Sequence, residues 1–176
     1  MLAADASTFI TIRLPRYGAI TGTILDENDV GLPQQTIVAY RAAQPLELAA
    51  RAMSDERGIY RIGGLEPGMY LVRTAGNRDE DIEYLPTFPK ETLRVEESRV
   101  IDVALEEDAR NMDVRPLAGR LFSISGNATT NPRGAPVTIT LVSDTGRQTV
   151  PGPAFQFNSL PPGPYELYAE ARKIPP

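Results

Sequence analysis

The stretch ERGIYRIGGLEPGMYLVR, residues 56–73, returns in altered form as PAFQFNSLPPGPYELYA, residues 153–169. Five apolar or glycine positions correspond at a constant spacing of 95 residues: Tyr60 with Phe155, Ile62 with Phe157, Leu65 with Leu160, Gly68 with Gly163, and Tyr70 with Tyr165. A pattern that recurs at a fixed spacing indicates a repeated structural unit. We therefore expect the chain to build the same unit twice.

Each copy has the pattern of two strands joined by a turn. Tyr60 and Ile62 alternate with their neighbours at a period of two, which is typical of a half-buried strand. The alternation resumes at Tyr70 and Val72, so a second strand should run antiparallel to the first. Leu65 lies between strand and turn and is expected to close one end of the core.

Two glycine-containing turns bound these strands. Residues 55–58 form a turn signal, in which Gly58 can take the positive φ that closes a tight turn. Residues 66–69 fit a type II turn, where Pro67 presets φ at the second position and Gly68 supplies a positive φ at the third. Gly163 also follows a proline, so the pattern predicts a positive φ at both Gly68 and Gly163.

The likeness extends upstream of this stretch. Gly18–Leu25, which includes Gly22, precedes a polar turn and the candidate strand Thr36–Tyr40. Ile124–Ala128 and Val137–Val142 are its counterparts in the second copy. Many short strands, with turn signals about every eight to twelve residues, predict an all-β fold of two tandem Greek-key β-sandwich modules. A single helical turn is expected only within residues 89–97.

The order of the strands predicts the domain organisation. Candidate strands at Arg99–Leu105 and Asn111–Leu117 complete the first copy, and Thr8–Leu14 resembles the latter in its alternation just before a new unit. We expect residues 1–14 to be the end of a preceding unit or an extra edge strand, 15–117 to be the first sandwich, and 118–176 to be the second.

The second copy has fewer candidate strands than the first and is expected to be incomplete. The chain is therefore expected to be a slice through a longer tandem array. Missing strands leave backbone groups unpaired and part of an apolar face uncovered, which is costly. Three arrangements can repair this: contact with the first unit, pairing with a neighbouring chain, or use of a spare strand such as Thr8–Leu14. We favour contact with the first unit or with a neighbouring chain.

Composition excludes several classes of partner. The 176 residues are 41% hydrophobic and 23% charged, which is typical of a soluble globular protein. The net charge of -5 argues against nucleic acid, whose phosphates require a basic face. No run approaches the roughly 20 apolar residues of a membrane span, and the first residues lack the pattern of a signal peptide.

Histidine and cysteine are both absent. Without cysteine there is no disulfide, no thiolate nucleophile and no zinc–cysteine site. Without histidine, a Ser-His-Asp triad and a histidine-based metal centre are impossible. We therefore expect a protein that is not an enzyme and that carries no catalytic residue, no metal and no cofactor.

The combined pattern G-x-I-x-G-x-I…G-x-P…D-x-x-G-x-Y-x-I-x-x-L-x-P-G-x-Y-x-V resembles that of the carboxypeptidase regulatory-like domain family. The first copy carries the pattern at Gly18, Ile20, Gly22, Ile24, Gly31, Pro33, Asp55, Gly58, Tyr60, Ile62, Leu65, Pro67, Gly68, Tyr70 and Val72. The second copy matches mainly at residues 160–165 and lacks the Asp-x-x-Gly motif before Phe155.

The resemblance implies a prealbumin-like or carbohydrate-binding-like sandwich of about seven strands. In this family the domain is a non-catalytic accessory, and bacterial members occur in secreted or envelope-anchored proteins as spacers and binding modules. The residues expected to form the turns and the core of the two copies are Gly22, Gly58, Tyr60, Leu65, Pro67, Gly68, Tyr70, Leu160, Gly163 and Tyr165. Ligand-binding residues are not identified by the resemblance.

Two candidate ligand sites have simpler structural explanations. Asp26–Gly31 resembles the start of a calcium loop, but Ile37 stands at the twelfth position, where a bidentate glutamate is needed. We favour an ordinary hairpin turn. Tyr17 and Tyr168 are candidates for an exposed sugar-stacking platform, but scattered surface aromatics rarely form one, and tryptophan is absent.

The segment Tyr84–Pro89 is expected to be either a flap over the edge of the sandwich or an exposed contact patch, and we favour the flap. Related adhesin domains form a lysine–asparagine isopeptide bond that requires a lysine early in the sandwich. The only lysines are Lys90 and Lys173, so this bond is not expected.

The sequence thus predicts a non-catalytic structural spacer or interaction module of a larger secreted or cell-envelope protein. The expected partners are neighbouring domains of that protein and protein or polysaccharide at the cell surface. A carbohydrate-binding module is the alternative, and an exposed coplanar aromatic face would distinguish it.

Overall fold

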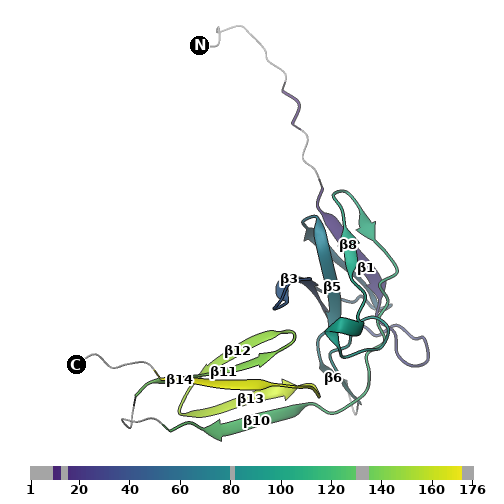
Figure 1. Cartoon of the computed structure of the whole chain (residues 1–176). Helices are drawn as coiled ribbons and strands as arrows, with labels where there is room; N and C mark the ends of the chain where they lie inside the picture. The colour runs from purple at the N-terminus through teal and green to yellow at the C-terminus, as the bar shows by residue number, and fades with distance from the viewer. Residues whose placement is uncertain (1–9, 13–15, 80–81, 130–134, 172–176) are drawn as a thin grey trace, which may run out of the picture.

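The computed structural model describes residues 10–12, 16–79, 82–129 and 135–171. Its secondary structure is almost entirely β, and the only helix in those ranges is a single 3-10 turn, η1 (Val95–Glu97). The predicted all-β fold and the single helical turn within residues 89–97 are both confirmed. Figure 1 shows that the strands gather into two bodies, which we call the first unit (residues 16–119) and the second unit (residues 120–171).

The first unit is a sandwich of two sheets with a short hairpin beside them. One sheet has the strand order β4-β1-β9, the other has the order β3-β2-β5-β8, and β6 and β7 form the hairpin. The strands are β1 (Gly18–Thr23), β2 (Thr36–Arg41), β3 (Glu47–Met53), β4 (Ile59–Leu65), β5 (Gly68–Thr74), β6 (Asn77–Asp79), β7 (Ile82–Tyr84), β8 (Ile101–Val103) and β9 (Asp108–Ala109).

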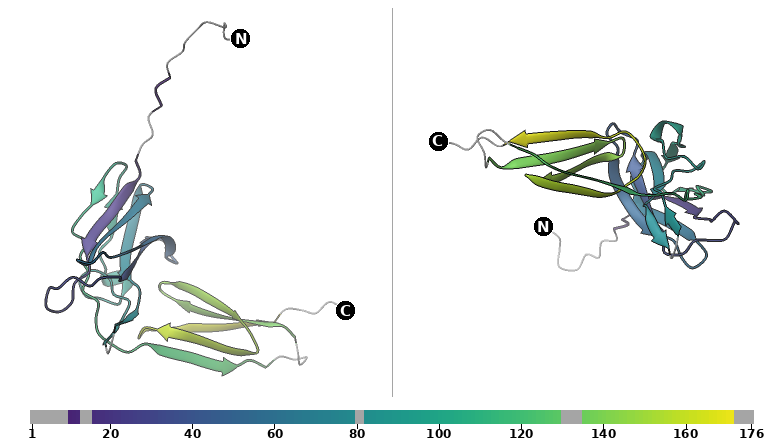
Figure 2. Two further views of the ribbon diagram at one scale, coloured as in Figure 1. Left: turned by 180° about the vertical axis from the view of Figure 1, so that it is seen from behind. Right: turned by 90° about the horizontal axis from the view of Figure 1, so that it is seen from below.

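The second unit repeats part of this arrangement (Figure 2). One sheet pairs β10 with β13, as β1 pairs with β4, and the other has the order β12-β11-β14, which corresponds to β3-β2-β5. The strands are β10 (Phe122–Asn127), β11 (Val137–Ser143), β12 (Gly146–Pro151), β13 (Ala154–Leu160) and β14 (Glu166–Ala171). No described strand corresponds to β8 or β9, and the domain boundaries given by the sequence remain predictions.

Alternating side chains from both sheets fill the core of the first unit. Tyr60 and Ile62 from β4 and Tyr70 and Val72 from β5 are each at most 1% exposed, and they pack against Ile20 from β1. Burying one such side chain stabilises the fold by about 1.5–3 kcal/mol. The alternation seen in the sequence therefore corresponds to the inward face of these strands.

An edge strand completes the sheet around β1. Met112 and Val114 donate backbone hydrogen bonds to the carbonyls of Thr21 and Thr23 at 3.1 and 3.0 Å, and Val114 pairs in parallel with Ile24. Both apolar side chains are buried. The strand expected at residues 111–117 is thus present only as a short run of hydrogen bonds along β1 and Ile24, which we call the edge strand.

The core of the second unit is smaller and less well covered. Val137, Ile139, Leu141, Phe157 and Leu160 are buried in it. Every residue of β14 is exposed. Leu167 stands opposite the buried Leu141 in the sheet, yet it is 48% exposed, whereas Val72 in the corresponding position of β5 is fully buried.

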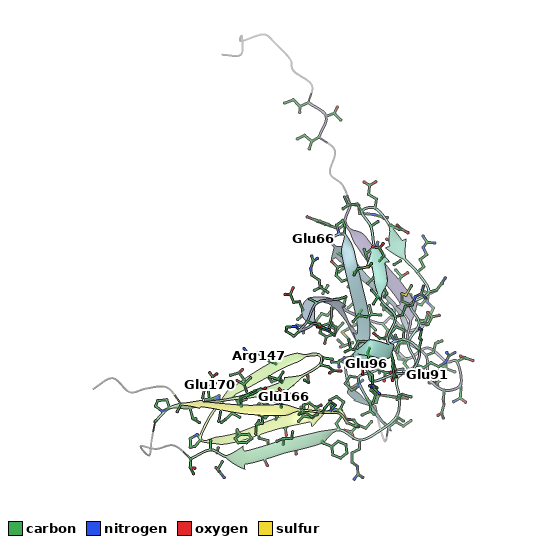
Figure 3. All side chains as sticks on the ribbon, in the orientation of Figure 1. Glu66, Glu91, Glu96, Arg147, Glu166 and Glu170 are labelled. Atoms are coloured by element: carbon green, nitrogen blue, oxygen red, sulfur yellow. The ribbon has the colours of Figure 1, made fainter. Side chains whose placement is uncertain are left out.

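The two faces of the β12-β11-β14 sheet carry different kinds of side chain. Arg147 and Glu166 both stand opposite Val142, so their side chains lie on the same face of the sheet, and Figure 3 labels them together with Glu170. Leu167 is on the other face, toward the core, because successive side chains of a strand alternate. The exposure of Leu167 therefore comes from an uncovered core face.

The positive φ predicted at Gly68 is confirmed, but the type II turn predicted at residues 66–69 is wrong. Gly68 has a φ of +155°, far from the roughly +80° that the third position of that turn requires, and it begins β5. Gly163 has no positive φ. The loop is closed instead by a side chain, because the Tyr70 hydroxyl donates a hydrogen bond to the Glu66 carbonyl at 2.8 Å.

The left-handed residue lies four positions earlier in each unit. Gly64 has a φ of +75°, and Ser159, which is 95 residues later, has a φ of +56°. Both lie where the strand register shifts, between Ile62 and Leu65 in β4 and between Phe157 and Leu160 in β13. Two residues oppose one across the sheet at these points, so each is a β-bulge that strengthens the local twist.

Other sequence expectations have mixed outcomes. The turn at residues 55–58 is confirmed, with Gly58 at a φ of +77° and its N–H bonded to the Asp55 carbonyl at 2.9 Å. Neither the β6–β7 hairpin nor β12 was predicted from the sequence. Of Thr8–Leu14, residues 10–12 are described and lie in no strand, and the rest of that segment lies outside the described residues.

Candidate functional site at the junction of the two units

The residues expected from the sequence to form turns and core lie in two separate cores. Tyr60, Leu65 and Tyr70 are buried in the first unit, and Leu160 and the half-buried Tyr165 lie in the core of the second. They do not converge on one site. Their side chains are therefore placed to hold each sandwich together.

Close backbone approaches explain two of the glycines. A Cβ at Gly22 would lie 2.3 Å from the Met112 carbonyl oxygen, and one at Gly58 would lie 2.4 Å from that of Ile24. No side chain fits at these distances without a backbone shift. Gly22 thus lets the edge strand at Met112 approach β1.

A tyrosine hydrogen bond is repeated in the two units. Tyr70 donates to the Glu66 carbonyl at 2.8 Å, and Tyr165 donates to the Pro161 carbonyl at 2.7 Å. A tyrosine that bonds back to the backbone a few residues upstream is the tyrosine corner of Greek-key sandwiches. The sequence analysis placed both rings in the core but did not predict this hydrogen bond. The signal for it was the same in both units: a tyrosine four residues after the carbonyl that accepts the bond.

The segment Tyr84–Pro89 is a flap, as the sequence favoured. All six of its residues are buried. Phe88 packs with Leu46 and Leu71 on the outer face of the β5 sheet, in an apolar cluster separate from the main core. Thr87 joins the flap to β5, since the backbone N–H of Thr74 donates to its carbonyl and its own N–H donates to the Thr74 hydroxyl, both at 2.9 Å.

The same flap holds the connection to the second unit. The Thr87 hydroxyl donates to the Leu85 carbonyl at 2.8 Å and accepts the N–H of Leu117 at 3.0 Å. Leu85 donates its N–H to the Leu117 carbonyl, and Gly119 donates to Glu83, both at 2.8 Å. The chain therefore leaves the first unit on a path fixed by hydrogen bonds to the flap.

Arg73 lies beside this connection, between two aromatic rings. Its guanidinium carbon is 5.6 Å from the centre of the Tyr40 ring and 5.5 Å from that of Phe88, distances at which a cation and a ring attract. Its Nε is buried and has no hydrogen-bond partner among the described residues. The rings rather than an acidic partner hold this charge in place.

A cleft runs between the units next to Arg73. From the first unit it is lined by Arg73 and Tyr40, and from the second by Ser143, Gln148 and Tyr165. Burial raises the pKa of the Tyr165 hydroxyl, the charge of Asp144 raises it further, and the charge of Arg73 partly opposes them. The cleft can offer aromatic, hydroxyl and amide groups together with the charges of Arg73, Arg94, Arg147 and Asp144.

Asp26–Gly31 is a capped turn, as the sequence analysis favoured over a calcium loop. The Asp26 carboxylate accepts the N–H groups of Asn28 and Val30, both at 2.8 Å. These bonds, that of Val30 foremost, lower the pKa of Asp26. The carboxylate is thus occupied by its own turn, and no group of three or more acidic, histidine or cysteine side chains in the described ranges could hold a metal.

The aromatic platform considered for sugar binding is not assembled. Tyr17 and Tyr168 are 52% and 49% exposed, but they belong to different units. The pair of rings in contact within the described ranges is Phe155 and Phe157, at a centroid distance of 6.0 Å and an angle of 53°. These two rings are tilted and part of the second core, so they offer no flat surface.

Comparisons with known proteins add little. No protein-family model matches the sequence, so the carboxypeptidase regulatory-like family is not confirmed, and no curated protein matches it. The TIE protein of Bacillus anthracis is similar to the chain, with a TM-score of 0.41, 13% identity and coverage of 89% of this chain and 31% of that protein. A mutant of the shaft pilin SpaA from Lactobacillus rhamnosus GG has a TM-score of 0.36, 10% identity and coverage of 92% and 89%.

These likenesses are distant. Both TM-scores are below 0.5, and the chain spans about a third of the TIE protein, so neither comparison assigns a function. In the described ranges no helix has the length and apolar character needed to cross a membrane.

Proposed function

We propose that the chain is a non-catalytic structural spacer or interaction module, made of two tandem β-sandwich modules, in a larger secreted or cell-envelope protein. One observation carries the proposal: hydrogen bonds to the flap and to Glu83 hold residues 117–119, the segment that leads into the second module. A spacer has to keep its modules at a set orientation. A flexible tether would need no such bonds.

The remaining parts of the proposal rest on the sequence. Its resemblance to the carboxypeptidase regulatory-like family supports a location outside the cytoplasm, with domain limits near residues 15–117 and 118–176. The absence of histidine and cysteine supports a role other than catalysis. The partners proposed are neighbouring domains of the parent protein and protein or polysaccharide at the cell surface.

Small-angle X-ray scattering can test the fixed orientation. Thr87→Val keeps the shape of the side chain but removes the hydroxyl that accepts the Leu117 N–H. Thr92→Val is a matched control, because Thr92 is also buried and its hydroxyl bonds only within residues 92–97. We expect one narrow distribution of sizes for the wild type and Thr92→Val, and a broader one for Thr87→Val. If the wild type already shows the broad size distribution expected of Thr87→Val, its modules have no fixed orientation and the spacer proposal is rejected.

Carbohydrate binding is a second candidate, favoured by the cleft beside Arg73. Side chains such as Gln148, Ser143 and Tyr165 can form hydrogen bonds to sugar hydroxyls and pack on a ring face. Titration with bacterial polysaccharides should then shift the amide resonances of Ser143 and Gln148. If these signals stay unchanged with saturating polysaccharide, the cleft is not a sugar site.

A further inference from the structure

The cleft beside Arg73 lies in the corner between the two units. Figure 1 shows the hairpin of β11 and β12 directed toward the first unit, and Figure 2 shows the same approach from two other sides. The part of the cleft lined by Tyr40, Leu48 and Arg147 has a volume of about 330 Å³. Ligand sites in proteins typically occupy roughly 300–1,000 Å³, so this part is large enough to hold a small ligand.

Arg73 brings a positive charge into this cleft that no acidic side chain neutralises. None of the ion pairs within the described ranges includes Arg73. Its one hydrogen bond there runs from Nη2 to the Tyr40 hydroxyl at 3.4 Å. An arginine has five N–H donors, so most of those of Arg73 have no acceptor among the described residues. A guanidinium in this state can bind a carboxylate through two parallel hydrogen bonds.

The guanidinium of Arg73 is held in place before any ligand binds. The Tyr40 and Phe88 rings lie 5.6 and 5.5 Å from its central carbon, and Phe88 is fully buried under the flap. A planar cation positioned by two rings loses little side-chain freedom when it pairs with an anion. The rings therefore favour binding without neutralising the charge.

A second arginine of the same sheet shows what a satisfied guanidinium looks like. Arg41 in β2 also lies over a ring, that of Tyr70, at 5.5 Å. Unlike Arg73, it forms an ion pair with Glu66. Arg41 does not line the cleft. The unpaired charge of Arg73 is thus a feature of the cleft and not of arginines on this sheet.

The other charges of the cleft leave it positive. Arg147 in β12 is exposed and forms no ion pair within the described ranges. Arg94 is already paired with the two glutamates of η1. Asp144, in the turn between β11 and β12, is exposed to solvent, which screens its charge. Two unpaired cations therefore face one solvated carboxylate, on a chain whose net charge is -5.

The uncharged lining of the cleft suits a sugar better than a peptide. Ser143, Thr145 and Gln148 supply hydroxyl and amide groups, and the half-buried ring of Tyr165 lies beside them. Three of the residues 161–164 on the same wall are prolines, which have no backbone N–H. A peptide that binds by strand addition needs such donors. Hydroxyl groups on a ligand ring can be bound by the side chains alone.

We propose that this cleft binds an acidic polysaccharide, in which the carboxylate of a uronic acid residue pairs with Arg73. Arg147 strengthens the attraction at longer range, and Ser143 and Gln148 bind sugar hydroxyls. The inference rests on the carbohydrate binding proposed above and names the class of sugar. A neutral sugar can use the same hydroxyl and amide groups, but it leaves the charge of Arg73 unpaired and binds more weakly.

Oligomers of galacturonic acid and their methyl esters are a matched pair of probes, because esterification removes the carboxylate charge and keeps the sugar. Each is titrated into the full chain, and the amide resonances of Ser143 and Gln148 report binding. We expect the acid to bind at least about tenfold more tightly than the ester, which is typical of hydrogen bonds to a charged group.

Variants assign the difference to Arg73. Arg73→Gln should weaken binding of the acid by about tenfold or more and leave binding of the ester unchanged. Arg73→Lys keeps the charge without the planar fork, so its affinity for the acid should lie between those of the wild type and Arg73→Gln. Arg41→Gln is the matched control and should bind both probes as the wild type does.

Arg147→Gln provides a test that does not depend on the packing around Arg73, because Arg147 is exposed. It should weaken binding of the acid a few-fold at low salt, and this loss should shrink as salt is added. An affinity for the acid that is the same in Arg147→Gln and in Arg73→Gln as in the wild type would overturn the proposal.

Three results with the wild type would also overturn it. Equal binding of the acid and the ester would retain a sugar site and reject recognition of the carboxylate. Polyglutamate that binds as tightly as the acid oligomer would show that the cleft takes an acidic peptide instead. Absence of binding by either oligomer would reject the sugar site altogether. The spacer is tested separately by scattering, so it stands or falls on its own.

Discussion

The two units share their local pairing and differ in how their cores are covered. Ile20 in β1 is fully buried, whereas Ile124, at the corresponding place in β10, is half-buried. Val72 and Leu167 differ in the same way. The repeated stretch thus specifies strand pairing, bulge and tyrosine corner in both units, while burial depends on segments outside it, such as residues 101–114.

The largest expected effect is a difference in the stability lost when an isoleucine is truncated in each of the two cores. Ile20→Ala should lower the free energy of unfolding by about 2–5 kcal/mol, because it leaves a cavity in a closed core. Ile124→Ala should cost about half as much or less, since solvent already reaches this side chain. Urea unfolding, with amide hydrogen exchange to assign the loss to one unit, measures both. Equal losses would mean that the second core is packed as well as the first.

A smaller effect tests whether the two bulges are equivalent. Gly64→Ser should destabilise the protein by about 1–2 kcal/mol, because an L-residue is strained at a φ of +75° and no atom nearby would otherwise clash. Ser159→Gly should stabilise it, by less than about 1 kcal/mol, since the relief of strain is partly offset by a more flexible unfolded chain. Shifts in the urea midpoint report both. Loss of stability in Ser159→Gly would contradict the shared bulge.

The smallest expected effect is on the loss of folding stability at acidic pH. The Asp55 carboxylate accepts the N–H groups of Ile59 and Arg57 at 2.8 and 2.9 Å, and these bonds, led by that of Ile59, lower its pKa below the usual value for an aspartate. Because the pKa is lower in the folded state, the stabilisation is present above about pH 4 and is lost as the pH falls through the folded pKa. Asn at this position accepts the same bonds without titrating.

Asp55→Asn should therefore make the urea midpoint of the first unit fall less between neutral pH and about pH 3. Val150 stands 95 residues after Asp55, so the second unit has no matching carboxylate. Amide exchange in β13 should be the same in variant and wild type. An unchanged acid dependence in the first unit would show that the Asp55 bonds do not contribute to it.

Sequence patterns predicted the parts of the fold that depend on interactions between residues close together in the chain. The period of two identified the inward residues Tyr60 and Tyr70, and the Asp-x-x-Gly motif identified the turn that ends at Gly58. The run of aromatic and proline residues at 84–89 predicted a covering flap, because so many apolar side chains need burial. In each case the signal and the structure involve neighbouring residues.

The remaining features depend on contacts between distant segments. The Pro67-Gly68 sequence suggests a type II turn, but Gly68 pairs with Val103 in β8, so it is extended. β9 consists of only two residues, Asp108 and Ala109, and joins β1 in parallel, so no periodicity marks it. The cleft beside Arg73 combines side chains from both units. Neither composition nor spacing indicates which of these segments meet.

The parallel pairing of β1 with the edge strand at Met112 and Val114 has a mechanical consequence. Tension along the chain would act on the N-terminal end of β1 and on the C-terminal end of the edge strand. Since the two strands point the same way, this force shears them past each other and loads their hydrogen bonds together, instead of opening them one at a time. In single-molecule stretching, the first unit should therefore extend at a higher force than the described part of the second unit, where β10 pairs with β13 alone.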